Sequence, residues 1–249
     1  MKKLSLVFAS LALLSSGAFA ADLPVAPATP AYKVPAMVPA PVYSWTGCYV
    51  DGGAGYALWT QDHYGESYPG LVSSTGSSTA GGRGWYGQAG GGCDYQFSLG
   101  GLGNFIIGVL GDYDFASIKG NFESSFATTS ALEKQTNTWV AGGRVGFLIT
   151  PSFLTYISGG YTEAKFDAIN FGTFGLPANT YKGWFLGGGS ETSLSTWLPT
   201  GFFLRSEYRY SSFSATDLPY SGAGIGLAEN SKKYEQMLGT ELIYRFSFQ

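Results

Sequence analysis

Charged residues are scarce in this chain: Asp, Glu, Lys and Arg together make up 12% of it, against about 25% in an ordinary soluble domain. There is one histidine and there are two cysteines, and the sequence has no HxxxH spacing, no CxxC spacing and no phosphate-binding glycine loop. Metal, nucleotide and other cofactor chemistry therefore has no support. The net charge of −3, without any basic cluster, also argues against a nucleic-acid partner.

Long hydrophobic runs are also lacking, and the one short run lies at the N-terminus. Lys2 and Lys3 precede the almost wholly apolar segment Leu4–Leu14, and Ala18-Phe19-Ala20 has small residues where signal peptidase requires them. The alternative, a transmembrane anchor, needs about 20 apolar residues, roughly twice this run. We therefore predict a signal peptide over residues 1–20. An exported chain without a later run of that length is either free of the membrane or crosses it as a closed barrel.

A proline-rich segment follows, and we predict that residues 21–44 form an extended, disordered periplasmic leader. It holds six of the eleven prolines: Pro24, Pro27, Pro30, Pro35, Pro39 and Pro41. Proline at this density cannot donate the hydrogen bonds of a sheet and favours an extended chain. A proline-rich recognition motif is the less favoured alternative.

The C-terminal segment Tyr234–Phe248 alternates with a period of two. From residue 238 on, the even positions are mostly aliphatic or aromatic, whereas Glu241 and Arg245 lie at odd positions. This pattern predicts a long strand with one apolar face. A long strand that ends in aromatic residues is typical of the last strand of an outer-membrane barrel. We expect its aromatic positions to be the assembly signal for the barrel-assembly machinery: Tyr244, Phe246 and Phe248.

Residues 45–249 contain eight alternating segments of this kind, separated by polar or glycine-rich connections. The predicted strands are Thr46–Trp59, Trp85–Phe97, Asn104–Ile118, Asn137–Ile149, Phe153–Phe166, Lys182–Leu194, Phe202–Phe213 and Tyr234–Phe248. Long connections alternate with short ones, as in bacterial barrels with extracellular loops and tight periplasmic turns. A glycine-rich soluble sandwich could share the composition but has no reason to keep its long loops at one end. We predict an all-β, eight-stranded antiparallel transmembrane β-barrel in the outer membrane.

The parity of the charged residues assigns one face of each strand to the barrel interior. In the second and third strands, Asp94 and Asp114 belong to this inward face, and in the fifth strand Glu163 and Lys165 suggest that odd positions point inward. The predicted interior charge network comprises Asp51, Asp112, Arg144, Glu191, Arg205, Glu207, Arg209, Glu241 and Arg245.

An eight-stranded barrel is only wide enough for side chains to fill, and an unpaired buried ion costs several kcal/mol. We therefore expect the glutamates of this set to pair with its four arginines. Two interpretations remain: a structural plug of ion pairs, which we favour, and a gated path for ions. Aromatic belts at the lipid boundary are expected from Trp59, Trp85, Trp139, Trp184 and Tyr210.

The two cysteines, Cys48 and Cys93, lie on neighbouring predicted strands, share the outward parity and fall at similar depths toward the periplasmic end. Antiparallel neighbours at such depths can come within disulfide range, and the periplasm is oxidising. We predict a Cys48–Cys93 disulfide; the alternative is a pair of small apolar residues that face lipid.

Several strand motifs resemble one known family. Trp45-Thr46-Gly47-Cys48-Tyr49-Val50-Asp51-Gly52-Gly53 is similar to the opening strand of the small alphaproteobacterial outer-membrane β-barrel proteins, the porin-like surface antigens. Similar matches follow at Gly91–Gln96, Gly111–Asp114 and Gly183–Gly189. The resemblance implies an abundant, surface-exposed integral protein of the outer membrane, without a demonstrated transport activity.

Two kinds of function remain after these exclusions. Enzymatic activity lacks a suitable base, because His63 has only its sequence neighbour Asp62 as an acid, and neighbours in a loop seldom face each other.

We expect a structural envelope protein that contacts outer-membrane lipid and lipopolysaccharide. Its loop aromatics would bind an unidentified extracellular partner, or merely fold the loops: Tyr64, Tyr68, Phe122, Phe126, Phe171, Phe174 and Tyr220. The alternative is a narrow porin for ions or very small solutes.

Overall fold

The structure, a computed structural model, describes residues 44–222 and 226–246. The predicted signal peptide, the leader up to residue 43 and Phe248 lie outside the described residues. Within the described part of the chain, no helix is long and apolar enough to span a bilayer.

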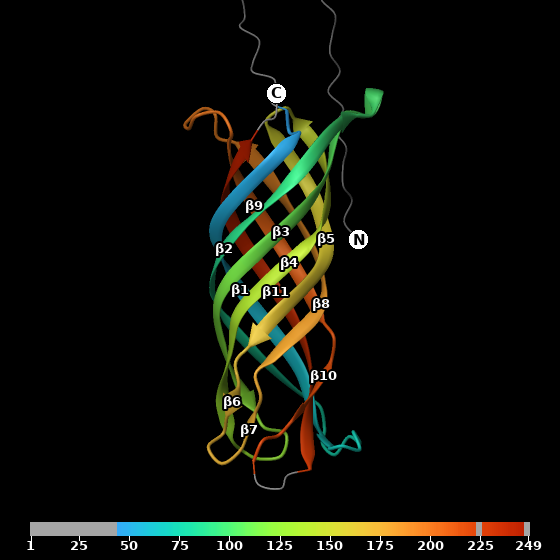
Figure 1. The fold of residues 1–249 in the computed structure, drawn as a ribbon, viewed down its shortest axis with the longest axis vertical. Helices are drawn as coiled ribbons and strands as arrows, with labels where there is room; N and C mark the ends of the chain where they lie inside the picture. Colours follow the sequence, from blue (N-terminus) through green and yellow to red (C-terminus); the bar gives the residue numbers. More distant parts are fainter. Residues whose placement is uncertain (1–43, 223–225, 247–249) are drawn as a thin grey trace, which may run out of the picture. The chain divides into compact units, whose positions relative to one another are not determined.

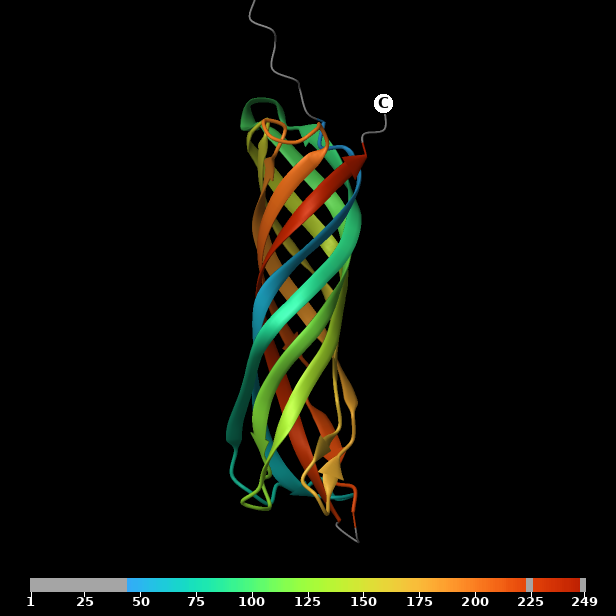
Figure 2. The same cartoon turned by 90° about the vertical axis from the view of Figure 1, so that its left-hand side faces the viewer.

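Eight long antiparallel strands form the wall of a closed barrel (Figure 1). They are β1 Gly47–Ser67, β2 Ser78–Ser98, β3 Asn104–Glu123, β4 Ser130–Thr150, β5 Phe153–Phe166, β8 Asn179–Ser193, β9 Phe202–Phe213 and β11 Leu227–Phe246. Each pairs with the next, and β11 pairs with β1 from Cys48↔Phe246 to Ser67↔Leu227. Figure 2 shows the red β11 beside the blue β1 at this closure. The predicted fold class is confirmed.

The connections differ between the two ends of the barrel. At one end, here called the turn end, β1 begins and β11 stops, and short segments join β2 to β3, β4 to β5 and β8 to β9; the first contains the 3-10 helix η1, Gly100–Leu102. At the other, the loop end, the connections after β1, β5 and β9 are longer, whereas the one between β3 and β4 comprises only residues 124–129. The connection between β5 and β8 includes the two-residue strands β6 Ile169–Asn170 and β7 Gly175–Leu176. The short strand β10, Thr216–Pro219, continues the wall beside β11 after β9 has ended.

Several strands extend farther toward the loop end than the sequence predicted. β1 continues from the predicted end at Trp59 to Ser67, and β2 begins at Ser78 instead of Trp85. The extensions alternate in burial: Gln61 and His63 are buried, whereas Thr60 and Asp62 are exposed. Polar residues occupy both faces of these segments, so hydrophobic periodicity could not identify them as strands.

Burial alternates along the strands largely as the parity of the charges predicted. In β1, the inward Asp51 is 8% exposed, whereas Val50 and Leu58, which point outward from the same strand, are 51% and 44% exposed. β5 contradicts the prediction, because its even positions are the buried ones and Glu163 and Lys165 point outward. Glu163 and Lys165 lie on the outer face near the loop end of β5, so their parity does not indicate which residues of this strand face the interior.

The aromatic belt also differs from the prediction at one position. Trp85 and Trp184 are exposed, and half-buried Trp139 and Tyr210 pack against outward aromatic neighbours. Trp59 is instead 1% exposed, because it shares the inward parity of Asp51. It belongs to a buried aromatic cluster inside the loop-end half of the barrel, with neighbours that include Phe166 and Tyr181.

Candidate functional site in the barrel interior

The interior of the turn-end half contains a group of ion pairs centred on Glu191 of β8. Glu191 Oε1 accepts hydrogen bonds from Arg144 Nη1 at 2.5 Å and Arg205 Nε at 3.0 Å, and its Oε2 accepts from Arg245 Nη2 at 2.6 Å. Arg205 also lies 3.4 Å from Asp51 Oδ2. One fully buried carboxylate therefore holds three arginines from three different strands.

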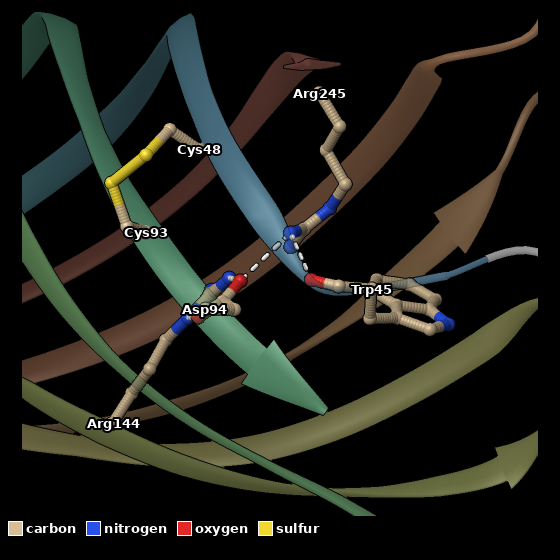
Figure 3. Close-up of a disulfide and its surroundings, with 6 residues drawn as sticks. All are labelled: Trp45, Cys48, Cys93, Asp94, Arg144 and Arg245. Atoms are coloured by element: carbon tan, nitrogen blue, oxygen red, sulfur yellow. Dashed lines mark hydrogen bonds and ion pairs between the residues drawn. A yellow bond between two sulfur atoms is a disulfide. The ribbon is translucent and has the colours of Figure 1, made fainter. Parts of the chain in front are cut away.

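Asp94 of β2 is the second anion of this group. Arg144 donates to both of its oxygens, at 2.9 and 2.5 Å, and Arg245 Nη1 donates to Oδ2 at 2.7 Å. Figure 3 shows Arg245 extending between Asp94 and the Trp45 carbonyl, to which it donates at 3.4 Å. Charge-assisted bonds of this kind offset the cost of burying the arginines, and they join the first and last strands to the rest of the wall.

A second group lies around Arg209 of β9. Its guanidinium donates to Glu207 Oε1 at 3.0 and 2.8 Å, to Asp112 Oδ2 at 2.6 Å and to Asp114 Oδ2 at 3.2 Å. The other Glu207 oxygen accepts the Tyr156 hydroxyl at 2.5 Å. Three carboxylates therefore share one guanidinium.

Aromatic rings fill the space beside the arginines. The Tyr49 ring lies under three guanidinium groups, with its centroid 4.7 Å from Arg144 Cζ, 5.0 Å from Arg205 Cζ and 4.9 Å from Arg245 Cζ. Cation–π attraction strengthens when water is excluded, as it is here. Toward the turn end, a buried apolar cluster that includes Trp45 and Phe203 follows directly. The interior at this level consists of ion pairs and packed rings.

The structure brings together eight of the nine residues predicted for the charge network. The exception is Glu241, which is buried but forms no ion pair within residues 44–222 and 226–246, and its Oε2 has no hydrogen-bond partner there. Two further members, Asp94 and Asp114, were assigned to the inward face but left out of the predicted network. Their parity with Gln88 and Asp112 was the signal that could have included them.

Charged residues also line the interior of the loop-end half: Lys233 and Glu133 in segments that the sequence assigned to loops, and Glu235 at the start of the last predicted strand. The Lys233 ammonium lies 2.7 Å from Glu133 Oε1, contacts Gln61, and lies over the rings of Trp59 and Phe166. Glu235 accepts hydrogen bonds from Gln135 and from Thr138, the latter at 3.4 Å.

His63 lies inside the barrel near the loop end. Its Nε2 is 3.2 Å from the Glu123 carbonyl and 3.9 Å from Glu229 Oε1. Asp62 points outward and accepts a hydrogen bond from Thr79, so the two sequence neighbours face opposite sides of the wall, as expected. Glu229 also accepts hydrogen bonds from Ser125 and from Tyr220, whose hydroxyl donates at 2.6 Å. Burial, together with the Glu229 carboxylate, raises the pKa of the Tyr220 phenol well above its ordinary value.

Most of the loop aromatics pack against one another. Tyr220 has ring centroids of Phe174 and Phe126 within 5.7 and 5.9 Å, and Phe171 stacks on Phe174 at 5.0 Å. Phe122 is fully buried, and Tyr64 is half-buried in β1. Only Tyr68 of the predicted set is exposed, at 46%, and it is accompanied by exposed Leu71 and Val72. The aromatic residues therefore serve mainly to fold the loops.

The two cysteines form the predicted disulfide. Cys48 and Cys93 are register partners on β1 and β2, with their Cα atoms 3.9 Å apart. Figure 3 shows the disulfide bridging β1 and β2, next to Asp94, which follows Cys93 in β2 and points inward. At the end of β11, Tyr244 and Phe246 are exposed on the outer surface, where an assembly signal would be accessible, but this role remains a prediction.

A closed barrel with an apolar, aromatic-belted outside and a charged, filled inside defines an integral outer-membrane β-barrel protein, in agreement with the predicted location. This class includes surface and envelope proteins. No family model matches the chain. The chain is 28% identical over 230 residues to the 31 kDa outer-membrane immunogenic proteins of Brucella melitensis and Brucella suis, covering 86% of this chain and 89% of each relative. These relatives confirm the resemblance to alphaproteobacterial outer-membrane barrels.

A solved structure supports the same fold. The outer-membrane protein OprG of Pseudomonas aeruginosa aligns with a TM-score of 0.52 and 12% identity, over 81% of this chain and 97% of that one. At this identity the similarity concerns the fold alone.

Proposed function

We propose that the protein is a structural component of the outer membrane whose barrel is closed to solutes and whose loop end meets the cell exterior. The main evidence is that buried ion pairs fill the barrel interior. Glu191, Arg144 and Arg205 are each at most 2% exposed, and Arg209 of β9 pairs across the interior with Asp112 and Asp114 of the opposite strand β3. A solute would have to break several charge-assisted hydrogen bonds to pass this level.

The packing on either side supports the same proposal. Apolar clusters lie above and below the ion pairs: one contains Trp59 and Met237 toward the loop end, and another contains Trp45 and Ile243 toward the turn end. Rings and aliphatic groups at both levels replace the water that an ion path would need. The alternative, a narrow porin, requires that these side chains rearrange together.

The proposed surface role rests on the loop 68–77 and its exposed apolar side chains Tyr68, Leu71 and Val72. In outer-membrane barrels the longer connections face the exterior. The rest of the loop end is held by its own aromatic cluster and by the Tyr220–Glu229 hydrogen bond, which leaves this loop as the surface best suited to an extracellular partner.

Planar-bilayer conductance of the mature protein tests the closed interior, with an Arg209→Ala variant measured beside it. Silence of the wild-type protein, with at most rare flickers, is the expected result. Steady ohmic steps whose size changes in the variant would instead identify a small porin. Heat-modifiable migration in gels verifies that each sample is folded, and Lys182→Gln, at an exposed position, is the matched control.

An epitope tag inserted into the loop 68–77 tests the orientation. Antibody should label intact cells that carry this insertion. A tag in the turn of residues 194–201 should be labelled only after the outer membrane is permeabilised. The reverse pattern would contradict the proposal.

A further inference from the structure

The outer wall contains a groove whose floor is glycine. It measures about 690 Å³ and lies over β2, β3, β4, β5 and β8. One register row crosses it: Val109 pairs with Gly143, Gly143 with Gly159, and Gly159 with Leu186. The two glycines leave a gap between the Val109 and Leu186 side chains, whose backbones are separated by three inter-strand spacings, or roughly 14 Å.

The neighbouring row toward the turn end closes the groove on that side. Val145 and Ile157 are register partners, project outward and are 49% and 67% exposed. Asp94 and Arg144 border the floor only with their backbones, because their side chains are fully buried in the interior network. The groove therefore presents mainly apolar side chains and glycine backbone, with Cys93 and the exposed Tyr95 at its β2 edge.

The groove lies at the depth of the lipid hydrocarbon. Toward the turn end, the outward rings of Phe105 and Phe147 contact each other with centroids 5.1 Å apart. Toward the loop end, Trp139 packs on Tyr161 at 5.5 Å. Aromatic belts mark the two membrane–water interfaces of a barrel, so a groove between them faces acyl chains.

We propose that this groove is a binding site for an acyl chain of an outer-membrane lipid. The occupant must be apolar, because the outward side chains that line the groove are apolar apart from the Tyr95 phenol at its β2 edge. It must also be slender, because the gap is only two strands wide at its floor. An acyl chain that lies on the glycine floor contacts protein atoms on several sides. A lipid beside a convex part of the wall makes fewer of these dispersion contacts. A second barrel, itself convex, would rest on Val145, Ile157 and Leu186 without reaching the floor.

The two floor glycines allow a sharp test, because each has room for a side chain. A Cβ at Gly143 would have its nearest neighbour at 3.5 Å, and one at Gly159 at 3.4 Å, both backbone oxygens in ordinary contact. Valine at both positions would fill the groove, and its Cβ atoms would meet the wall only in ordinary contact. Gly52→Val is the matched control: Gly52 is also exposed on the outer wall, its Cβ would lie 3.7 Å from the nearest atom, and it lies outside the groove.

The probe is a phosphatidylethanolamine with a diazirine on its acyl chain, added in trace amounts to dioleoylphosphatidylcholine vesicles that contain the mature barrel. After illumination, mass spectrometry should find adducts concentrated around Val145 and Ile157. The double variant Gly143→Val/Gly159→Val should lower them about tenfold, the effect of losing contacts with about two methylene groups. The control should retain them, and heat-modifiability verifies folding.

Three outcomes would overturn the proposal. Adducts spread evenly around the barrel would identify ordinary bulk lipid, and adducts undiminished in the filled variant would place the chain elsewhere. Protein–protein crosslinks formed at these strands by an added membrane-soluble bifunctional photocrosslinker, and lost in the filled variant, would identify a contact between two barrels.

Discussion

Arg144 of β4 and Asp94 of β2 form a two-point ion pair across the strand that separates them. Arg144 Nε and Nη2 donate to the two Asp94 oxygens at 2.9 and 2.5 Å. Gly108 of β3 is the register partner of both residues, and a Cβ there would lie 2.1 Å from Asp94 Oδ1. The missing side chain of Gly108 is therefore what lets the two charges meet.

A Gly108→Ala substitution should destabilise the barrel by displacing Asp94 from Arg144. The added methyl group would also meet the Cys93 carbonyl at 2.6 Å, so backbone relaxation offers no simple escape. We expect a loss of about 1–3 kcal/mol, typical of overpacking, in denaturant unfolding followed by tryptophan fluorescence in vesicles. Gly111→Ala, on the outer face of the same strand with 3.7 Å of clearance, should be neutral. Equal effects at both positions would contradict this explanation.

An Asp94→Ala substitution should cost about 3–5 kcal/mol, because it leaves two buried guanidinium groups without this anion. The unfolding midpoint in guanidinium chloride measures the loss. Lys182→Gln removes a surface ion pair with Glu163, 3.8 Å long, and should cost at most about 1 kcal/mol. A small loss in the Asp94 variant would mean that Glu191 alone suffices to hold Arg144 and Arg245.

Glu191 and Glu241 should respond differently to replacement by glutamine, although both are buried. Glu191 faces three arginines, so Glu191→Gln should destabilise the fold by several kcal/mol. Glu241 has no ion pair among the described residues, and Glu241→Gln removes a buried acid of nearly the same shape, so stability should stay the same or rise. The comparison is made by equilibrium unfolding at neutral pH. A large loss at Glu241 would show that its charge is compensated.

Removing the disulfide through Cys48→Ala/Cys93→Ala should lower stability without changing the fold. The bond closes a sequence separation of 45 residues between neighbouring strands, and restricting the unfolded chain to this extent stabilises by about 2–4 kcal/mol. The native barrel should still form, since β1 and β2 keep their full register of hydrogen bonds. Unfolding with and without reductant provides the measurement, and reductant should affect the wild-type protein alone.

Period-two alternation predicted the barrel, its strand order and most inward faces, because the environment of a strand residue depends on which side of the wall it faces. The prediction was wrong where that difference disappears. Residues 60–67 are polar on both faces and were placed in a loop, and the charges of β5 pointed outward. Trp59 was assigned to the lipid boundary by residue type, although its parity places it inside.

The sequence by itself determined the compartment class, the closed β-architecture and the inward location of the charges, because these depend on composition and on local periodicity. Only the tertiary structure decided which charges meet. The carboxylates that pair with Arg144, and the Asp112 and Asp114 carboxylates that pair with Arg209, come from strands that do not neighbour the arginine's own strand. These contacts depend on register around the closed wall and on glycines such as Gly108 that leave room between the charges. The same register placed Gly143 beside Gly159 and so created the outer groove. Such relationships join residues far apart in the chain, and no local pattern encodes them.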